Sequence, residues 1–105
     1  MRRAMEVVRS TNGIPIRLPE ERWVHITEEH CEMAGYLFEV LEAVAEPHAV
    51  FEGSAGEFLA VRPVDHERWL VVVYKEVGAE DGFIITVFLT KRLRQLERRT
   101  KVWPR

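Results

Sequence analysis

The sequence has a single cysteine, Cys31, among its 105 residues, so no disulfide can form within the chain. It has no apolar run near the roughly 20 residues that a membrane-spanning helix needs. The opening segment MRRAMEVVRS lacks the apolar core of a signal peptide. These absences predict a cytoplasmic protein with no membrane partner. The lone thiol is expected to be buried and unreactive.

The signatures of common catalytic and cofactor sites are missing as well. There is no glycine-rich phosphate loop, no GxSxG nucleophile motif and no CxxC pair. The histidines are His25, His30, His48 and His66, and no two of them have the i, i+4 spacing of a helical zinc-binding pair. We therefore expect no metal site and no cofactor.

What the chain does contain is typical of one globular domain over residues 1–105, since 47% of its residues are hydrophobic and 30% are charged. Its net charge of −2 is unevenly distributed. Residues 91–105 hold seven lysines and arginines against one glutamate, a balance of +6, which leaves −8 for residues 1–90. This basic segment predicts an anionic partner, nucleic acid first. The alternative is a solvated tail or a charged patch for self-association, and the oligomeric state stays open.

The hydrophobic pattern predicts an α+β fold. Residues 6–18 indicate two short N-terminal strands or a hairpin around Asn12-Gly13. Helical patterns follow over about 19–30 and 32–45, and the second half contains strand patterns joined by turns. We predict two helices packed on one face of a mainly antiparallel sheet of about four strands, in which 68–76 and 82–90 pair at the centre. A short helix or irregular tail should close the chain.

Two histidines in the first predicted helix are candidates for a site. His30 shares a side with Trp23 and Ile26, whereas His25 lies on another side with Arg22 and Glu29. For His30 the alternative is a half-buried, hydrogen-bonded histidine, and for His25 it is an exposed histidine on a charged face.

The last predicted strand adds hydroxyl groups. By the period of two, Thr86 and Thr90 share a face with Ile84 and Phe88, and a threonine there either holds a phosphate oxygen or is only a strand former. Of the adjacent Tyr74 and Lys75, only one can point to the face of Thr86. Arg62, on another strand, is within plausible reach of the same sheet.

Four segments now become informative by their order: GIPIRLPEERWVHITEEHCEM, VLEAVAEPHAVFEG, WLVVVYKEV and GFIITVFLT. Together, over roughly residues 13–92, they resemble the phage-associated and toxin-type members of the barnase–EndoU–colicin–RelE superfamily of small nucleases. The resemblance implies RNA cleavage without a metal, in which a ribose 2′-OH attacks the neighbouring phosphate. It also implies RNA as the partner, with a cognate inhibitor or antitoxin as a second one.

The resemblance implies roles for particular residues. His25 and His30 correspond to the helix histidines that move protons, and Thr86 or Thr90 to the hydroxyl of the last strand. Further phosphate or RNA contacts are expected from Arg62, Lys75, Tyr74, Lys91 and Arg92. We expect His30 to matter more than His25, because it would stand where the helix meets the sheet. The alternative function is a catalytically silent interaction or regulatory module with the same fold.

Overall fold

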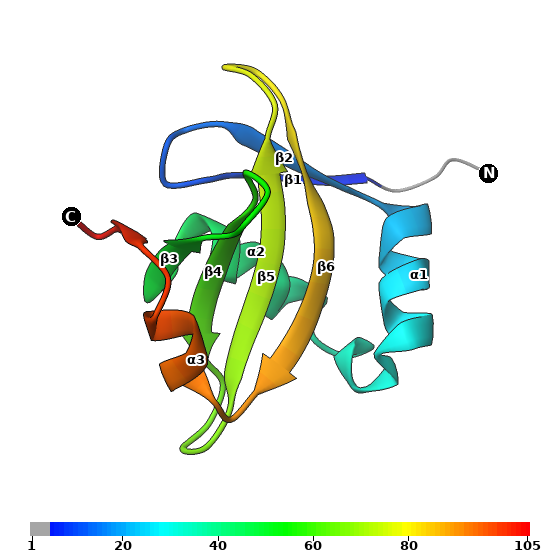
Figure 1. The fold of residues 1–105 in the computed structure, drawn as a ribbon. Coiled ribbons are helices and arrows are strands. Elements are labelled where there is room, and N and C mark those ends of the chain that lie inside the picture. Colours follow the sequence, from blue (N-terminus) through cyan, green and yellow to red (C-terminus); the bar gives the residue numbers. More distant parts are fainter. Residues whose placement is uncertain (1–4) are drawn as a thin grey trace.

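The computed structural model describes residues 5–105, whose strands all join one mixed sheet (Figure 1). Its order is β1-β2-β6-β5-β4-β3-β7. The strands are β1 (Met5–Arg9), β2 (Pro15–Pro19), β3 (Ala49–Glu52), β4 (Phe58–Pro63), β5 (Trp69–Glu76), β6 (Gly82–Thr90) and β7 (Lys101–Trp103). The helices are α1 (Glu20–Glu29), α2 (Leu37–Ala45) and α3 (Leu93–Glu97), with a short 3-10 helix, η1 (Cys31–Met33), between the first two.

The α+β class is confirmed, but the prediction of about four mainly antiparallel strands carrying two helices is wrong. Seven strands and three α-helices are present in residues 5–105, and β2 pairs with β6 in parallel. That parallel pairing joins the N-terminal hairpin to the main sheet through one residue pair, Arg17 and Phe83. A contact this short between distant segments leaves no periodic signal in the sequence. The predicted antiparallel pairing of β5 with β6 is confirmed.

The sheet has two covered faces, which we call inner and outer. On the inner face α2 buries Val40, Ala43 and Val44 against the strands. On the outer face α3 buries Leu96. Figure 1 shows α2 behind the sheet, α3 in front of it, and α1 beside β6. The expectation that two helices share one face is therefore wrong for α1, which flanks the sheet, while the third helix was expected only as part of the tail.

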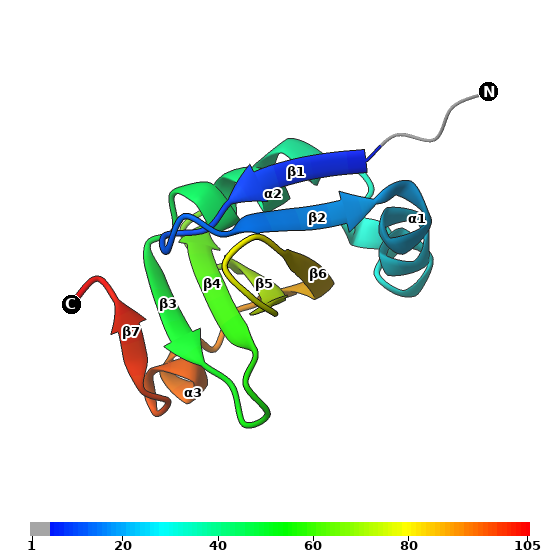
Figure 2. The ribbon, with the colours of Figure 1, turned by 90° about the horizontal axis from the view of Figure 1, so that it is seen from above.

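The N-terminal hairpin turns at Gly13, whose φ of +80° lies in the left-handed region that glycine adopts readily. Seen from above, β1 and β2 run across the other strands, and α2 lies against β1 (Figure 2). The buried Ser10 fastens this turn, because its hydroxyl donates to Oε2 of Glu76 at 2.6 Å. Asn12 donates to the same carboxylate at 3.1 Å. The hairpin is thereby tied to the end of β5.

An irregularity in β6 decides which side chains share a face. Thr86 lies opposite Val73, but the next pair is Ile84 with Tyr74, so Ile85 has no opposite residue in β5. This bulge shifts the alternation by one position. Thr86 therefore lies on the outer face with Val73, while Ile84 is buried on the inner face with Tyr74. The expectation that Ile84 shares a face with Thr86 and Phe88 is wrong, because simple alternation fails across a bulge.

The basic segment 91–105 is folded onto the sheet. Leu93 and Leu96 of α3 pack on the outer-face cluster, and β7 pairs antiparallel with β3. Val102 and Trp103 pack against the main core. The segment is therefore folded, and its lysines and arginines are exposed on the surface.

The sequence predicted a buried Cys31 and no membrane-spanning helix. Cys31, expected to be buried, is exposed, because the chain leaves α1 at His30 and turns through η1 instead of continuing the buried stripe. Within residues 5–105, no helix combines the length and the apolar character that crossing a bilayer requires.

Candidate active site

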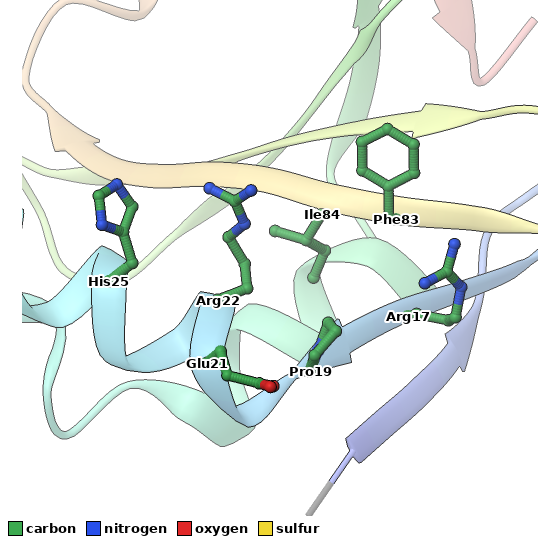
Figure 3. Close-up of a pocket in the computed structure, with 7 residues that line it drawn as sticks. All are labelled: Arg17, Pro19, Glu21, Arg22, His25, Phe83 and Ile84. Atoms are coloured by element: carbon green, nitrogen blue, oxygen red, sulfur yellow. The ribbon is translucent and has the colours of Figure 1, made fainter.

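A groove of about 480 Å³ lies between α1 and the start of β6 (Figure 3). Figure 3 shows the side chains of Arg22 and His25 extending from α1 towards β6, whereas Glu21 points away from that strand. Arg17 and Phe83 stand at the other end of the groove. The groove is lined by Arg17, Pro19, Glu21, Arg22, His25, Phe83 and Ile84.

The packing of α1 sets the direction of its polar side chains. Ile26 is buried and Trp23 is half-buried against the main core. Arg22 and His25 are three positions apart and lie on one side of the helix, so both extend into the groove once Ile26 is anchored. Oε2 of Glu29, one turn further, lies 3.5 Å from Nε2 of His25. A carboxylate therefore lies beside the imidazole ring at the groove.

The outer face next to the groove carries a row of three side chains across neighbouring strands. Arg17 of β2 lies opposite Phe83 of β6, and Phe83 lies opposite Lys75 of β5. Because opposite residues share a face, two cations flank one aromatic ring. Thr86 follows Phe83 on this face after the bulge. Two expected site residues, Lys75 of β5 and Thr86 of β6, thus share the outer face with Phe83, which lines the groove together with His25.

The two groove arginines differ in their electrostatic state. Nε of Arg17 donates to Oδ1 of Asp81 at 2.7 Å, and its Nη2 donates to Oδ2 at 3.1 Å. The hydrogen bond from Arg17 and, to a smaller extent, the positive charge of Arg17 hold the pKa of the Asp81 carboxyl below its usual range. Arg17 is therefore already neutralised by a two-point ion pair. Arg22 is the groove arginine better suited to meet a phosphate.

We expect Arg17→Gln to raise the pKa of Asp81 back towards its ordinary value of about 3.9. A carboxyl with a depressed pKa stabilises the fold above its ordinary pKa, and this contribution disappears as the pH falls through the folded-state value. The variant should therefore lose less stability than wild type on acidification below about pH 4. An NMR titration of the side-chain carboxyls measures the shift. Asp65, whose pKa of about 2 depends on Arg68, is the internal control and should not move.

His30 occupies a different environment from His25. It ends α1 with φ −130° and ψ 74°, and its amide donates to the carbonyl of Ile26 at 2.7 Å. Its Nδ1 lies 3.8 Å from Oε2 of Glu32, and it is not among the residues that line the groove. His25 is the one histidine among the groove residues described above. From the sequence His30 was expected to matter more, whereas the geometry of the groove favours His25.

Two other expected phosphate contacts lie away from the groove. Arg62 pairs across the sheet with Leu70 on the inner face, donates to the carbonyl of Glu46, and lies 3.5 Å from Oε1 of Glu42. It therefore holds the end of α2. Tyr74 is only 1% exposed on the inner face, where burial, with a smaller effect of Glu76, raises the pKa of its phenol. Of the Tyr74–Lys75 pair, Lys75 is the one on the face of Thr86.

The remaining expected site residues lie at the opposite end of β6. The Thr90 hydroxyl accepts a hydrogen bond from the Arg92 amide at 3.0 Å, so it shapes the turn into α3. Lys91 and Arg92 are exposed beside it. These three residues belong to a surface separate from the groove, because β6 runs its full length between the two places.

The groove includes residues that sequence reasoning did not assign to a site: Arg17, Arg22 and Phe83. Arg22 could have been assigned from the sequence, because helical periodicity alone places it on the same side of the helix as His25 and Glu29. No local signal in the sequence predicted that Arg17 and Phe83 lie side by side, because their pairing depends on the parallel contact of β2 with β6.

In residues 5–105 no group of three or more histidine, cysteine, aspartate or glutamate side chains is placed to hold a metal ion. No protein-family model, curated protein or solved structure matches the chain. Its function is therefore inferred from the side chains themselves and from the resemblance of the sequence motifs.

Proposed function

We propose that this chain is a metal-independent endoribonuclease of the toxin or phage-derived type, with its active site in the groove between α1 and β6. The observation that carries the proposal is that Arg22 and His25 extend from one side of α1 towards the strand that bears Thr86. Histidine suits proton transfer near neutral pH because its ordinary pKa is about 6.5. Arginine suits a phosphate because its guanidinium donates two parallel hydrogen bonds.

In the proposed reaction the ribose 2′-oxygen attacks the adjacent phosphorus as its proton leaves, and the bond from phosphorus to the 5′-oxygen breaks. The leaving 5′-oxygen takes up a proton, so the products are a 2′,3′-cyclic phosphate and a 5′-hydroxyl. His25, which lies 3.5 Å from the carboxylate of Glu29, performs one of the two proton transfers. Arg22 stabilises the charge that develops on the phosphate.

The outer-face residues next to the groove complete the proposed site. Lys75 supplies a second cation on the side of β6 away from α1, and the Thr86 hydroxyl can donate to a phosphate oxygen. The ring of Phe83 offers a surface on which a base can stack. The body of the domain is acidic, so these few cations have to offset the repulsion that RNA experiences there.

Cleavage is expected to survive chelation, since His25 and Arg22 are assigned their roles without a metal and no metal-holding group is formed by residues 5–105. The assay incubates the purified protein with a single-stranded RNA, labelled at one end, in excess EDTA, and identifies the terminus of the products. We expect products ending in a 2′,3′-cyclic phosphate at the same rate with and without EDTA. Loss of cleavage in EDTA that zinc restores would overturn the metal-independent mechanism.

A second candidate is RNA binding without cleavage. One observation favours it. Among the groove side chains drawn in Figure 3, only His25 both points towards β6 and is suited to proton transfer near neutral pH, and the Glu21 side chain points away. The same assay separates the candidates: RNA that is bound but stays intact over a long incubation supports the binding module.

A further inference from the structure

A second hollow, of about 550 Å³, lies beside α3 on the basic segment. It is lined by Lys91, Arg92, Leu93, Arg94, Gln95 and Glu97, so three cations meet one carboxylate. Nζ of Lys91 is 3.9 Å from Oε1 of Glu67, and both side chains are largely exposed. An ion pair that long and that exposed contributes little. The hollow therefore keeps an excess of positive charge in a domain whose other residues are acidic overall.

Two aromatic side chains of the outer face lie close in the fold to Thr90, the residue before Lys91. Trp69 of β5 lies directly opposite Thr90, the residue of β6 that leads into α3. Phe88, two residues before Thr90 in β6, lies on the same face. Both rings are half-buried in the cluster that Leu93 and Leu96 join. His48 meets the Trp69 ring edge-on, with the ring centroids 5.0 Å apart. Cations beside partly exposed aromatic rings suit the backbone and the bases of a single strand.

We propose that the α3 hollow, formed by Lys91, Arg92 and Arg94 beside Trp69 and Phe88, is a second RNA-binding surface that selects long single strands. β6 links it to the groove, since Phe83 lies near one end of that strand and Thr90 at the other. Seven residue steps along a strand span roughly 23 Å. An RNA that reaches both places must therefore extend over several nucleotides. The choice of RNA as ligand rests on the proposed function.

The shape of the surface favours a single strand over a duplex. Trp69 and Phe88 can stack only with bases whose faces are free, and a duplex hides those faces. The three cations can meet successive phosphates of either nucleic acid. Discrimination between single-stranded and duplex RNA is therefore the property that the aromatic rings supply.

The test measures RNA binding by fluorescence anisotropy in EDTA, with His25→Gln in every protein so that no cleavage occurs. The probes are a single-stranded RNA of about 20 nucleotides and the corresponding duplex. Arg92→Gln combined with Arg94→Gln should weaken binding of the single strand by about tenfold or more. The slope of log affinity against log salt should become shallower by about 1.4, since each lost phosphate contact removes about 0.7. Arg92→Gln is also measured alone. Its control is Arg9→Gln, an equal change of charge on β1, which should have almost no effect.

Three outcomes would overturn the proposal. The double variant could bind the single strand with unchanged affinity and salt slope, Arg9→Gln could weaken binding as much as Arg92→Gln does, or the duplex could bind as tightly as the single strand. The outcome is independent of catalysis. If the His25→Gln protein binds with the expected slope while the wild-type protein fails to cleave RNA in the EDTA assay, the surface is supported and the nuclease is refuted. If the wild-type protein cleaves RNA in EDTA while Arg92→Gln combined with Arg94→Gln leaves binding unchanged, the nuclease is supported and the surface is refuted.

Discussion

Replacing His25 by glutamine is expected to reduce the rate of RNA cleavage by about 100-fold or more, because the groove loses its proton-transferring side chain. The side chain of His25 is 55% exposed and makes one ion pair, with Glu29, so the free energy of unfolding should change by less than about 0.5 kcal/mol. Rates are measured on a labelled RNA in EDTA, and stability by urea denaturation of the same preparations.

His30→Gln is the matched control, since it makes the same chemical change at the end of the same helix. His30 lies beside Glu32 and does not line the groove, so its replacement should change the cleavage rate by less than about tenfold. An inactive His30→Gln protein beside an active His25→Gln protein would refute the placement of the site in the groove and support the prediction made from sequence.

Gly82→Ala is expected to destabilise the fold by about 1–3 kcal/mol, because the new methyl group has no space. A Cβ atom at this position would lie 2.5 Å from Cδ1 of Ile16 and 2.6 Å from the backbone oxygen of Lys75. The second atom belongs to the β5 backbone and cannot move without disturbing its pairing with β6. The strain falls where β2 meets β6, beside Arg17 and Phe83, so RNA cleavage should decrease together with stability. For a domain of this size the melting temperature should fall by about 4–8 °C per kcal/mol.

Gly78→Ala supplies the control within the same hairpin. No atom lies within 4 Å of a Cβ built at Gly78, apart from its chain neighbours. The variant should therefore melt within about 2–4 °C of wild type. Equal destabilisation by the two substitutions would show that the crowding at Gly82 is relieved by movement of the hairpin as a whole.

The local signals in the sequence predicted most of the individual elements. Valine-rich and aromatic runs on either side of a turn predicted β5 and β6, and the stripe that includes Val40 and Val44 predicted the core-facing side of α2. These features depend on residues close together in the chain, where side-chain period and turn chemistry act directly. For the same reason helix periodicity placed Arg22, His25 and Glu29 on one side of α1.

The number of strands in the sheet could not be predicted in this way. The parallel contact between Arg17 and Phe83 involves a single residue pair, and β7 is only three residues long. Neither gives a pattern long enough to distinguish from a loop. The bulge near Ile85 also lacks a sequence marker, and it alone separates Ile84 from the face of Thr86.

The sequence by itself determined the elements, the charge asymmetry and the side of α1 that is polar, because each depends on neighbours in the chain. Only the tertiary structure decided that α1 flanks β6 instead of covering a face, and that His25 rather than His30 therefore lines the groove. It also decided that Tyr74 is in the core while Lys75 is on the outer face. The physical reason is that long-range packing of Ile26 and the pairing of β2 with β6 fix the direction in which these side chains point, and neither interaction is encoded within a local stretch of sequence.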